Sequence, residues 1–111
     1  MPQRRDKTRS ERRPGSGSHH AIYRVVGQIP SGKVLSYGEV GKIVGVGPRQ
    51  VAAAMRGCPP GVPWHRVVGS GGVVRTKGET ASIQKQSLIA EGIRLRGARF
   101  SYSLYRWKGT S

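Results

Sequence analysis

The stretch SYGEVGKIVGVGPRQVAAAMR, residues 36–56, contains the start and stop signals of two short helices. Ser36 and Glu39 have the spacing of a capping box. In this motif the serine accepts a hydrogen bond from a free backbone N–H, and the glutamate reaches back to the cap. We therefore expect a helix that begins after Ser36, ends at the glycines that follow residue 44, and turns Val40, Ile43 and Val44 inward.

A second helix is expected from Pro48 to about Arg56. Proline suits the first helical position because it has no N–H to leave unpaired there. The helix carries three consecutive alanines, residues 52–54, and stops at Gly57. Two short helices joined by a tight glycine turn predict a helix-turn-helix.

The flanking segments complete a mainly helical fold. Apolar residues at helical spacing predict a helix from Ala21 that Pro30 ends, with Ser18 as its cap. Residues 67–75 place two valine pairs on either side of a glycine-rich turn, which predicts a small β-hairpin. A further helix is expected at 81–90, and an extended segment at 93–107 packs back on the body. The predicted fold is a winged-helix-like helix-turn-helix domain. The inward-facing apolar residues of the 81–90 helix are expected to be Ile83, Leu88 and Ile89.

The chain is strongly basic. Its 111 residues include 20 Lys and Arg and 5 Asp and Glu, a formal net charge of +15. Residues 1–18 hold six basic and two acidic residues, a net of +4, which leaves a net of +11 for residues 19–111. The first segment lacks apolar periodicity and predicts a disordered basic arm. Residues 19–111 are expected to form one domain, and a basic folded body favours a polyanionic partner such as DNA.

Composition excludes several classes of protein. No apolar run reaches the length of about 20 residues that a membrane span needs, so no membrane partner is expected. Cys58 is the only cysteine, which excludes a disulfide scaffold and favours a reducing compartment. The histidines and Cys58 do not have the spacing of a metal site. We expect no metal and no cofactor, and a location in the cytoplasm or on the nucleoid, or in the nucleus of a eukaryote.

Three ordered motifs carry a resemblance to a known family. They are IPSGKVLSYGEV at residues 29–40, RQVAAAMR at residues 49–56 and PWHRVV at residues 63–68, followed by a Glu-Gly pair at 91–92. Together they resemble the DNA-binding and active-site region of the O6-alkylguanine-DNA alkyltransferases. The resemblance covers roughly residues 20–95.

One position departs from the pattern of that family. The family has a reactive cysteine in Pro-Cys-His-Arg-Val, and here the corresponding residue is Trp64. A thiolate accepts an alkyl group, whereas an indole ring has no lone pair for that reaction. The sequence is therefore similar to the alkyltransferase-like proteins, which bind alkylated guanine without repairing it. His65 and Glu91 match the proton relay of the family, and without the cysteine we expect them to be structural.

The resemblance also implies roles for individual residues. The second helix would lie in the minor groove, where small alanines allow close approach. Arg49 would enter the base stack as the nucleotide flips out, and Tyr37 would press on its phosphate. The DNA-binding residues implied in this way are Ser36, Tyr37, Arg49, Gln50, Ala53, Ala54 and Arg56.

The lesion pocket is expected to be formed by residues from three segments. Trp64 would stack on the flipped base, and the carbonyls of Trp64 and Val67 would face its amine. Arg75 and Lys77 would reach the lesion or a nearby phosphate. The implied pocket residues are Tyr37, Trp64, Val67, Arg75 and Lys77.

The implied function is noncatalytic recognition of O6-alkylguanine in duplex DNA, by a monomer that flags the lesion for nucleotide excision repair proteins. Two other functions stay open: a methyltransferase that uses Cys58, and a general basic DNA-binding protein. The family usually has asparagine where this chain has Cys58. The arginines in 94–106 are a solvated basic face, or contact phosphate or a partner protein.

Overall fold

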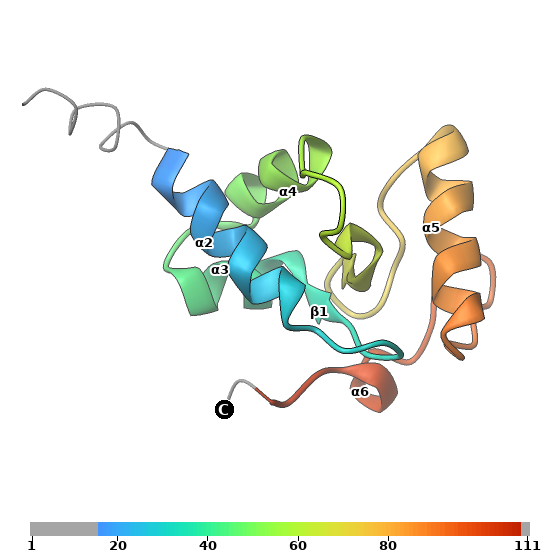
Figure 1. The fold of residues 1–111 in the computed structure, drawn as a ribbon. Helices are drawn as coiled ribbons and strands as arrows, with labels where there is room; N and C mark the ends of the chain where they lie inside the picture. Colours follow the sequence, from blue (N-terminus) through green and yellow to red (C-terminus); the bar gives the residue numbers. More distant parts are fainter. Residues whose placement is uncertain (1–15, 110–111) are drawn as a thin grey trace, which may run out of the picture.

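The computed structural model describes residues 16–109 and is mainly helical (Figure 1). The first helix, α2 (Ser16–Gly27), begins before the expected boundary at residue 19, so Ser18 lies inside it and is not its cap. The rest of the predicted arm, residues 1–15, lies outside the described residues. In the part of the chain that is described, no helix is both long and apolar enough to cross a membrane.

The helix-turn-helix has the predicted boundaries. Helix α3 (Tyr37–Val44) is followed by α4 (Pro48–Arg56), with Pro48 in the first turn. Gly45 ends α3 in the left-handed conformation, with φ of 96°. The turn packs so closely on α3 that a Cβ at Gly41 would lie 2.5 Å from the carbonyl oxygen of Val46. Glycine at 41 and 45 therefore permits the tight turn.

Only the serine half of the predicted capping box is present. Ser36 Oγ accepts the N–H of Glu39 at 3.0 Å. The carboxylate of Glu39 does not return to the cap directly, because the Tyr102 hydroxyl lies between them. This hydroxyl accepts the N–H of Ser36 at 2.8 Å and donates to Glu39 Oε1. A residue 66 positions away thus completes the cap.

The small sheet differs from the predicted hairpin. Strand β1 (Leu35–Ser36) pairs in parallel with β2 (Val67–Val68). The glycine-rich turn after β2 is present, but its arms share one antiparallel bridge, Gly69 with Val73. Val73 also bridges to Arg99, so the second arm turns toward the later part of the chain. Two valine pairs around a turn predict a hairpin from local sequence alone. In the structure the first pair, β2, forms its hydrogen bonds with β1, which is distant in the sequence.

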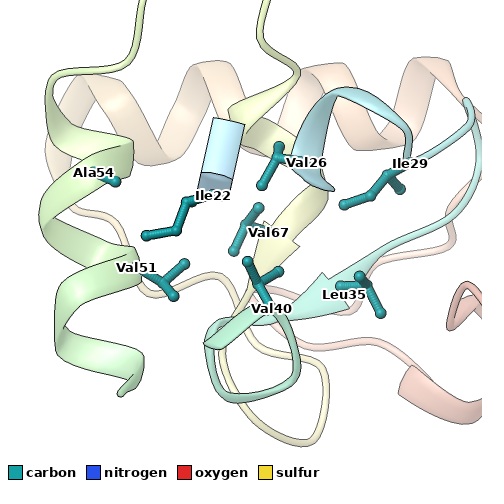
Figure 2. Packing of buried hydrophobic residues seen from close by; sticks show 8 residues of the cluster. All are labelled: Ile22, Val26, Ile29, Leu35, Val40, Val51, Ala54 and Val67. Carbon is teal, nitrogen blue, oxygen red and sulfur yellow. The ribbon is translucent and has the colours of Figure 1, made fainter. Parts of the chain in front are cut away.

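The first core cluster lies beneath the helix-turn-helix. Side chains from α2, α3 and α4 meet those of both strands (Figure 2). Val40 is fully buried as predicted, whereas Ile43 is 43% exposed, because α3 turns only one narrow face inward. This cluster fixes α4 relative to the strand that precedes α3. Its buried members are Ile22, Val26, Ile29, Leu35, Val40, Val51, Ala54 and Val67.

A second cluster fixes α5 (Gly78–Ala90) and the segment after it. The helix starts three residues earlier than predicted and buries Leu88 and Gln84. Ile83 and Ile89 are 49% and 57% exposed, so the inward orientation predicted for them is wrong. The helix has a narrow buried stripe at i, i+4 spacing, and a polar residue occupies half of it.

The last described segment packs back on the body, as predicted. It contains a turn closed by Arg96 and Arg99 and one short helix, α6 (Tyr102–Tyr105), where an extended segment was predicted. Val34 donates to the carbonyl of Tyr105 at 3.0 Å and accepts the N–H of Trp107 at 2.9 Å. Residues 102–107 therefore hold the chain just before β1.

Candidate nucleic-acid interface

A cleft of about 1020 Å³ separates α4 and the loop after it from the segment that leads into α5. Trp64, the first residue of the 3-10 helix η1 (Trp64–Arg66), lines it. The lining residues lie up to 43 positions apart in the sequence, and the fold brings them together. The cleft is lined by Tyr37, Pro48, Arg49, Ala52, Met55, Arg56, Cys58, Pro59, Pro60, Gly61, Val62, Trp64, Arg75, Thr76, Lys77 and Thr80.

The lining combines apolar and cationic groups. Four of the lining side chains are cations, Arg49, Arg56, Arg75 and Lys77, and none is a carboxylate. Burial raises the pKa of the Tyr37 hydroxyl above 10.0, and the nearby charges of Arg75 and Arg56 oppose part of that rise. Tyr37 therefore stays a neutral hydrogen-bonding group between cations. Such a cleft suits a flat ring attached to phosphates.

Trp64 lines the cleft at the start of η1. Two backbone hydrogen bonds hold it there: its N–H donates to the Val62 carbonyl at 2.7 Å, and its carbonyl accepts the N–H of Val67. Its ring meets the ring of His65 edge-on, with centroids 6.4 Å apart. The indole is half-buried, so part of it remains available to a ligand.

His65 and Glu91, the two predicted relay residues, are in contact. His65 Nε2 lies 2.8 Å from Glu91 Oε2. Arg66 donates from Nε and Nη2 to the same carboxylate, and the N–H of Gly32 donates to it at 2.9 Å. Burial raises the pKa of Glu91, but the hydrogen bonds from Arg66, Gly32 and His65 outweigh it and lower the pKa from 4.5 to about 2. The carboxylate is therefore ionised at neutral pH and can only accept hydrogen bonds. The hydrogen atom between the two side chains accordingly belongs to His65 Nε2, which donates to Glu91.

This network joins three separate segments. Arg66 also donates from Nη1 to the carbonyl of Ile29 at 2.7 Å, at the end of the segment that follows α2. Glu91 lies at the end of α5, and Gly32 lies in the turn before β1. The contact of His65 with Glu91 thus belongs to a structural brace under η1.

Gln84 supports the cleft wall from the interior, and sequence reasoning missed it. Its buried side-chain amide donates to the carbonyls of His65 and Val67 at 3.1 and 3.0 Å, and its oxygen accepts from Thr76 at 2.7 Å. It holds η1 against α5 and the cleft wall. A glutamine within the apolar stripe of a predicted helix is the one available signal, because a buried amide requires partners.

Five predicted DNA-binding or pocket residues do not line the cleft, namely Ser36, Gln50, Ala53, Ala54 and Val67, and three of them are buried. Val67 is fully buried, and its carbonyl already accepts the Gln84 amide. Ser36 is buried as the α3 cap, and Ala54 is fully buried with its carbonyl accepting the Tyr23 hydroxyl at 2.9 Å. The side chains of these three residues therefore face the interior, and the contacts with DNA or with the flipped base that the resemblance implies for them stay predictions.

The remaining predicted residues of α4 lie on or near its outer face. Arg49 and Arg56 are exposed and line the cleft. Gln50 uses its side-chain oxygen to accept the N–H of Gly47 at 3.2 Å, so it caps α4. Ala53 is half-buried, and Ala52 beside it lines the cleft. The outer face of α4 is thus low and flanked by arginines.

Cys58 also lines the cleft, where it is half-buried and has a free thiol. Burial raises the pKa of its thiol above 9.0, against a backbone hydrogen bond that lowers it. A protonated thiol is a weak nucleophile at neutral pH. Within residues 16–109 no group of three or more His, Cys, Asp or Glu side chains could hold a metal ion.

Comparison with known proteins gives a consistent result. Residues 18–93 match the family model described as 6-O-methylguanine DNA methyltransferase, DNA binding domain. A DNA base-flipping protein of Vibrio parahaemolyticus is 39% identical over 92 residues, which cover 78% of this chain and 92% of that protein. Alkyltransferase-like protein 1 of Schizosaccharomyces pombe is 38% identical over 98 residues, 78% of this chain and 91% of that protein.

The solved structures agree with the sequence comparison. S. pombe Atl1, in complex with damaged DNA containing O6-carboxymethylguanine, superposes with a TM-score of 0.74 at 34% identity. The match covers 83% of this chain and 95% of Atl1. The predicted fold class is thereby confirmed.

Proposed function

This chain belongs to the family of 6-O-methylguanine DNA methyltransferase DNA-binding domains, as an alkyltransferase-like protein, and we propose that it binds O6-alkylguanine in duplex DNA without removing the alkyl group. The observation that carries the proposal is the cleft in which Tyr37 and Trp64 lie among four cations, Arg49 included, and no carboxylate. The names of its relatives support the same function, since they describe base flipping and likeness to an alkyltransferase.

The outer face of α4 is proposed to enter the minor groove. Ala52 and Ala53 leave the helix surface low, so the backbone can approach the base edges. Arg49 stands at the first turn of α4 and lines the cleft. From there its guanidinium fills the gap in the stack while the nucleotide turns outward, which costs a few kcal/mol.

The flipped base is proposed to enter the cleft and stack on Trp64. Stacking of a base on an aromatic ring contributes about 1–3 kcal/mol, which offsets much of the cost of flipping. Tyr37 then contacts the phosphate of that nucleotide. Arg75 and Lys77 line the other side of the cleft and neutralise the phosphate or an anionic alkyl group.

Trp64 is proposed to replace the nucleophile of the catalytic relatives. An indole cannot accept an alkyl group, and the neighbouring contact of His65 with Glu91 serves the brace beneath η1. The raised pKa of Cys58 disfavours a substitute thiolate in the same cleft. The complex is proposed to persist as a monomer bound to its lesion and to flag it for nucleotide excision repair proteins.

The experiment that tests this function compares two duplexes that differ in a single O6-methylguanine. Fluorescence anisotropy at about 0.15 M salt should show roughly 100-fold tighter binding to the damaged duplex. Nucleoside analysis after incubation should recover the lesion intact. Equal affinities would leave only a general basic DNA-binding protein, and loss of the lesion would indicate methyl transfer, for which Cys58→Ser is the control.

Arg49→Ala is expected to lower the preference for damaged over normal duplex about fivefold, because the gap in the stack is left unfilled. Lys42 is the matched control, since it is exposed on α3 and does not line the cleft. Lys42→Ala should weaken both duplexes alike and reduce the salt slope by about 0.9. Anisotropy titrations over a range of salt measure both effects, and an unchanged preference in Arg49→Ala would disprove its role as a stacking finger.

A further inference from the structure

A second, smaller cavity lies outside the cleft, in the segment after α5. It measures about 590 Å³ and shares no lining residue with the cleft. We call it the arginine groove, defined by Arg94, Leu95, Arg96, Arg99, Phe100, Ser101, Leu104 and Tyr105. Two of its lining residues, Leu104 and Tyr105, belong to α6, which Figure 1 shows well away from α4.

The three arginines of the groove have no ionic partner in residues 16–109. Between residue 19 and residue 111 the chain has three acidic residues, Glu39, Glu79 and Glu91. Glu91 pairs with Arg66 and His65, and Glu39 pairs with Arg106. Arg94, Arg96 and Arg99 are all exposed. Their charges are therefore accessible to an anionic partner at the groove.

The groove also presents apolar and aromatic surface. Leu104 is 64% exposed, although it is a large apolar side chain. Phe100 and Tyr105 meet edge to face, with centroids 6.0 Å apart, and Phe100 is buried in the second core cluster. An exposed apolar residue framed by arginines and a tyrosine has the composition of a protein-binding site.

The walls of the groove are held in place by backbone contacts. Arg96 and Arg99 exchange both backbone hydrogen bonds, at 2.7 and 3.0 Å, across a turn. The Tyr105 hydroxyl accepts the N–H of Arg94 at 3.1 Å. The backbone at the three arginines is therefore ordered before a partner binds, which reduces the entropy lost on binding.

We infer that the arginine groove binds an acidic segment of another protein, with an apolar side chain of that segment seated against Leu104 and Tyr105. The charges of the arginines favour carboxylates in the partner. The exposed Leu104 adds an apolar contact that favours a protein segment over a DNA backbone. The position away from α4 lets this partner bind while the cleft is occupied. The inference does not depend on the proposed lesion recognition.

The test uses a labelled peptide of Asp and Glu residues around a central Leu-Phe pair, in fluorescence anisotropy with the whole protein. The double variant Arg96→Glu, Arg99→Glu should weaken binding about tenfold or more. Leu104→Ser should weaken it about threefold or more, because the apolar contact is lost. A peptide with Ser in place of Leu-Phe should lose about as much as Leu104→Ser.

The matched control reverses two exposed charges outside both cavities, Arg24→Glu with Lys33→Glu. It should change peptide affinity by less than about threefold at 0.15 M salt, where distant charges are screened. Equal losses in both double variants, or no detectable binding by the parent protein, would overturn the inference. So would a parallel loss of affinity for unmodified duplex in the Arg96→Glu, Arg99→Glu variant, which would assign the groove to DNA.

Discussion

Replacing Glu91 with alanine is expected to lower the free energy of unfolding by about 3 kcal/mol, because breaking a largely buried ion pair leaves its partner without compensation. The Glu91 side chain is only 13% exposed. Its loss leaves the guanidinium of Arg66 and the N–H of Gly32 without the carboxylate to which they donate. Urea denaturation at neutral pH measures the change. The effect on stability should exceed that of any surface substitution in this chain.

Glu79→Ala is the matched control, since Glu79 is an exposed acid in the first turn of the same helix. It should change stability by less than about 1 kcal/mol, the contribution of a charge near a helix terminus. If the two variants were equally stable, the brace under η1 would have no energetic role.

The same carboxylate predicts how stability depends on pH. The pKa of Glu91 is lowered from 4.5 to about 2 in the folded protein, so the folded state favours the ionised form. Its contribution is complete above about pH 4.5 and is lost as the pH falls toward 2. Glu91→Gln should show a flatter decline across this range. Urea midpoints collected between neutral pH and pH 2.5 would detect the difference, and parallel declines would contradict it.

Trp64→Ala is expected to remove most of the preference for damaged DNA, a loss of about 10- to 100-fold, because the flipped base has nothing to stack on. Affinity for the undamaged duplex should stay within about threefold, since phosphate contacts dominate it. Anisotropy with the paired duplexes measures both quantities.

Trp64→Phe provides the conservative control, because it keeps an aromatic face in the cleft. On a logarithmic scale, it should retain more than half of the affinity ratio between damaged and normal duplex. Thr80→Ala alters another cleft residue without removing an aromatic ring, and it should have little effect. A full preference in Trp64→Ala would show that the lesion does not bind against this side chain.

Local signals in the sequence predicted the helix-turn-helix well. Pro48 and Gly57 mark the ends of α4, and the Ser36 cap marks the start of α3. These signals act within a few residues of the helix that they limit. The motif resemblance then placed Tyr37, Arg49 and Trp64 in one site, and the fold brings all three to one cleft.

The errors involve contacts between distant segments. β2 pairs with β1, 32 positions earlier, instead of with its own neighbour. Gln84 occupies a buried position because the carbonyls of His65 and Val67 require a donor there. Ala54 sits in an alanine run that resembles a binding face, yet the α2 and α4 packing turns it inward. Helical periodicity alone cannot show which side of a short helix a later segment will cover.

The contact of Tyr102 with the start of α3 has a consequence for the order in which the domain assembles. The Tyr102 hydroxyl completes a cap 66 positions earlier, and residues 105 and 107 bond to Val34 beside β1. Contacts between such distant residues form late, because a long loop must close first. Residues 36–56 are also synthesised before residues 102–107. The segment at residues 102–107 therefore decides when the N-terminal cap of α3 becomes complete.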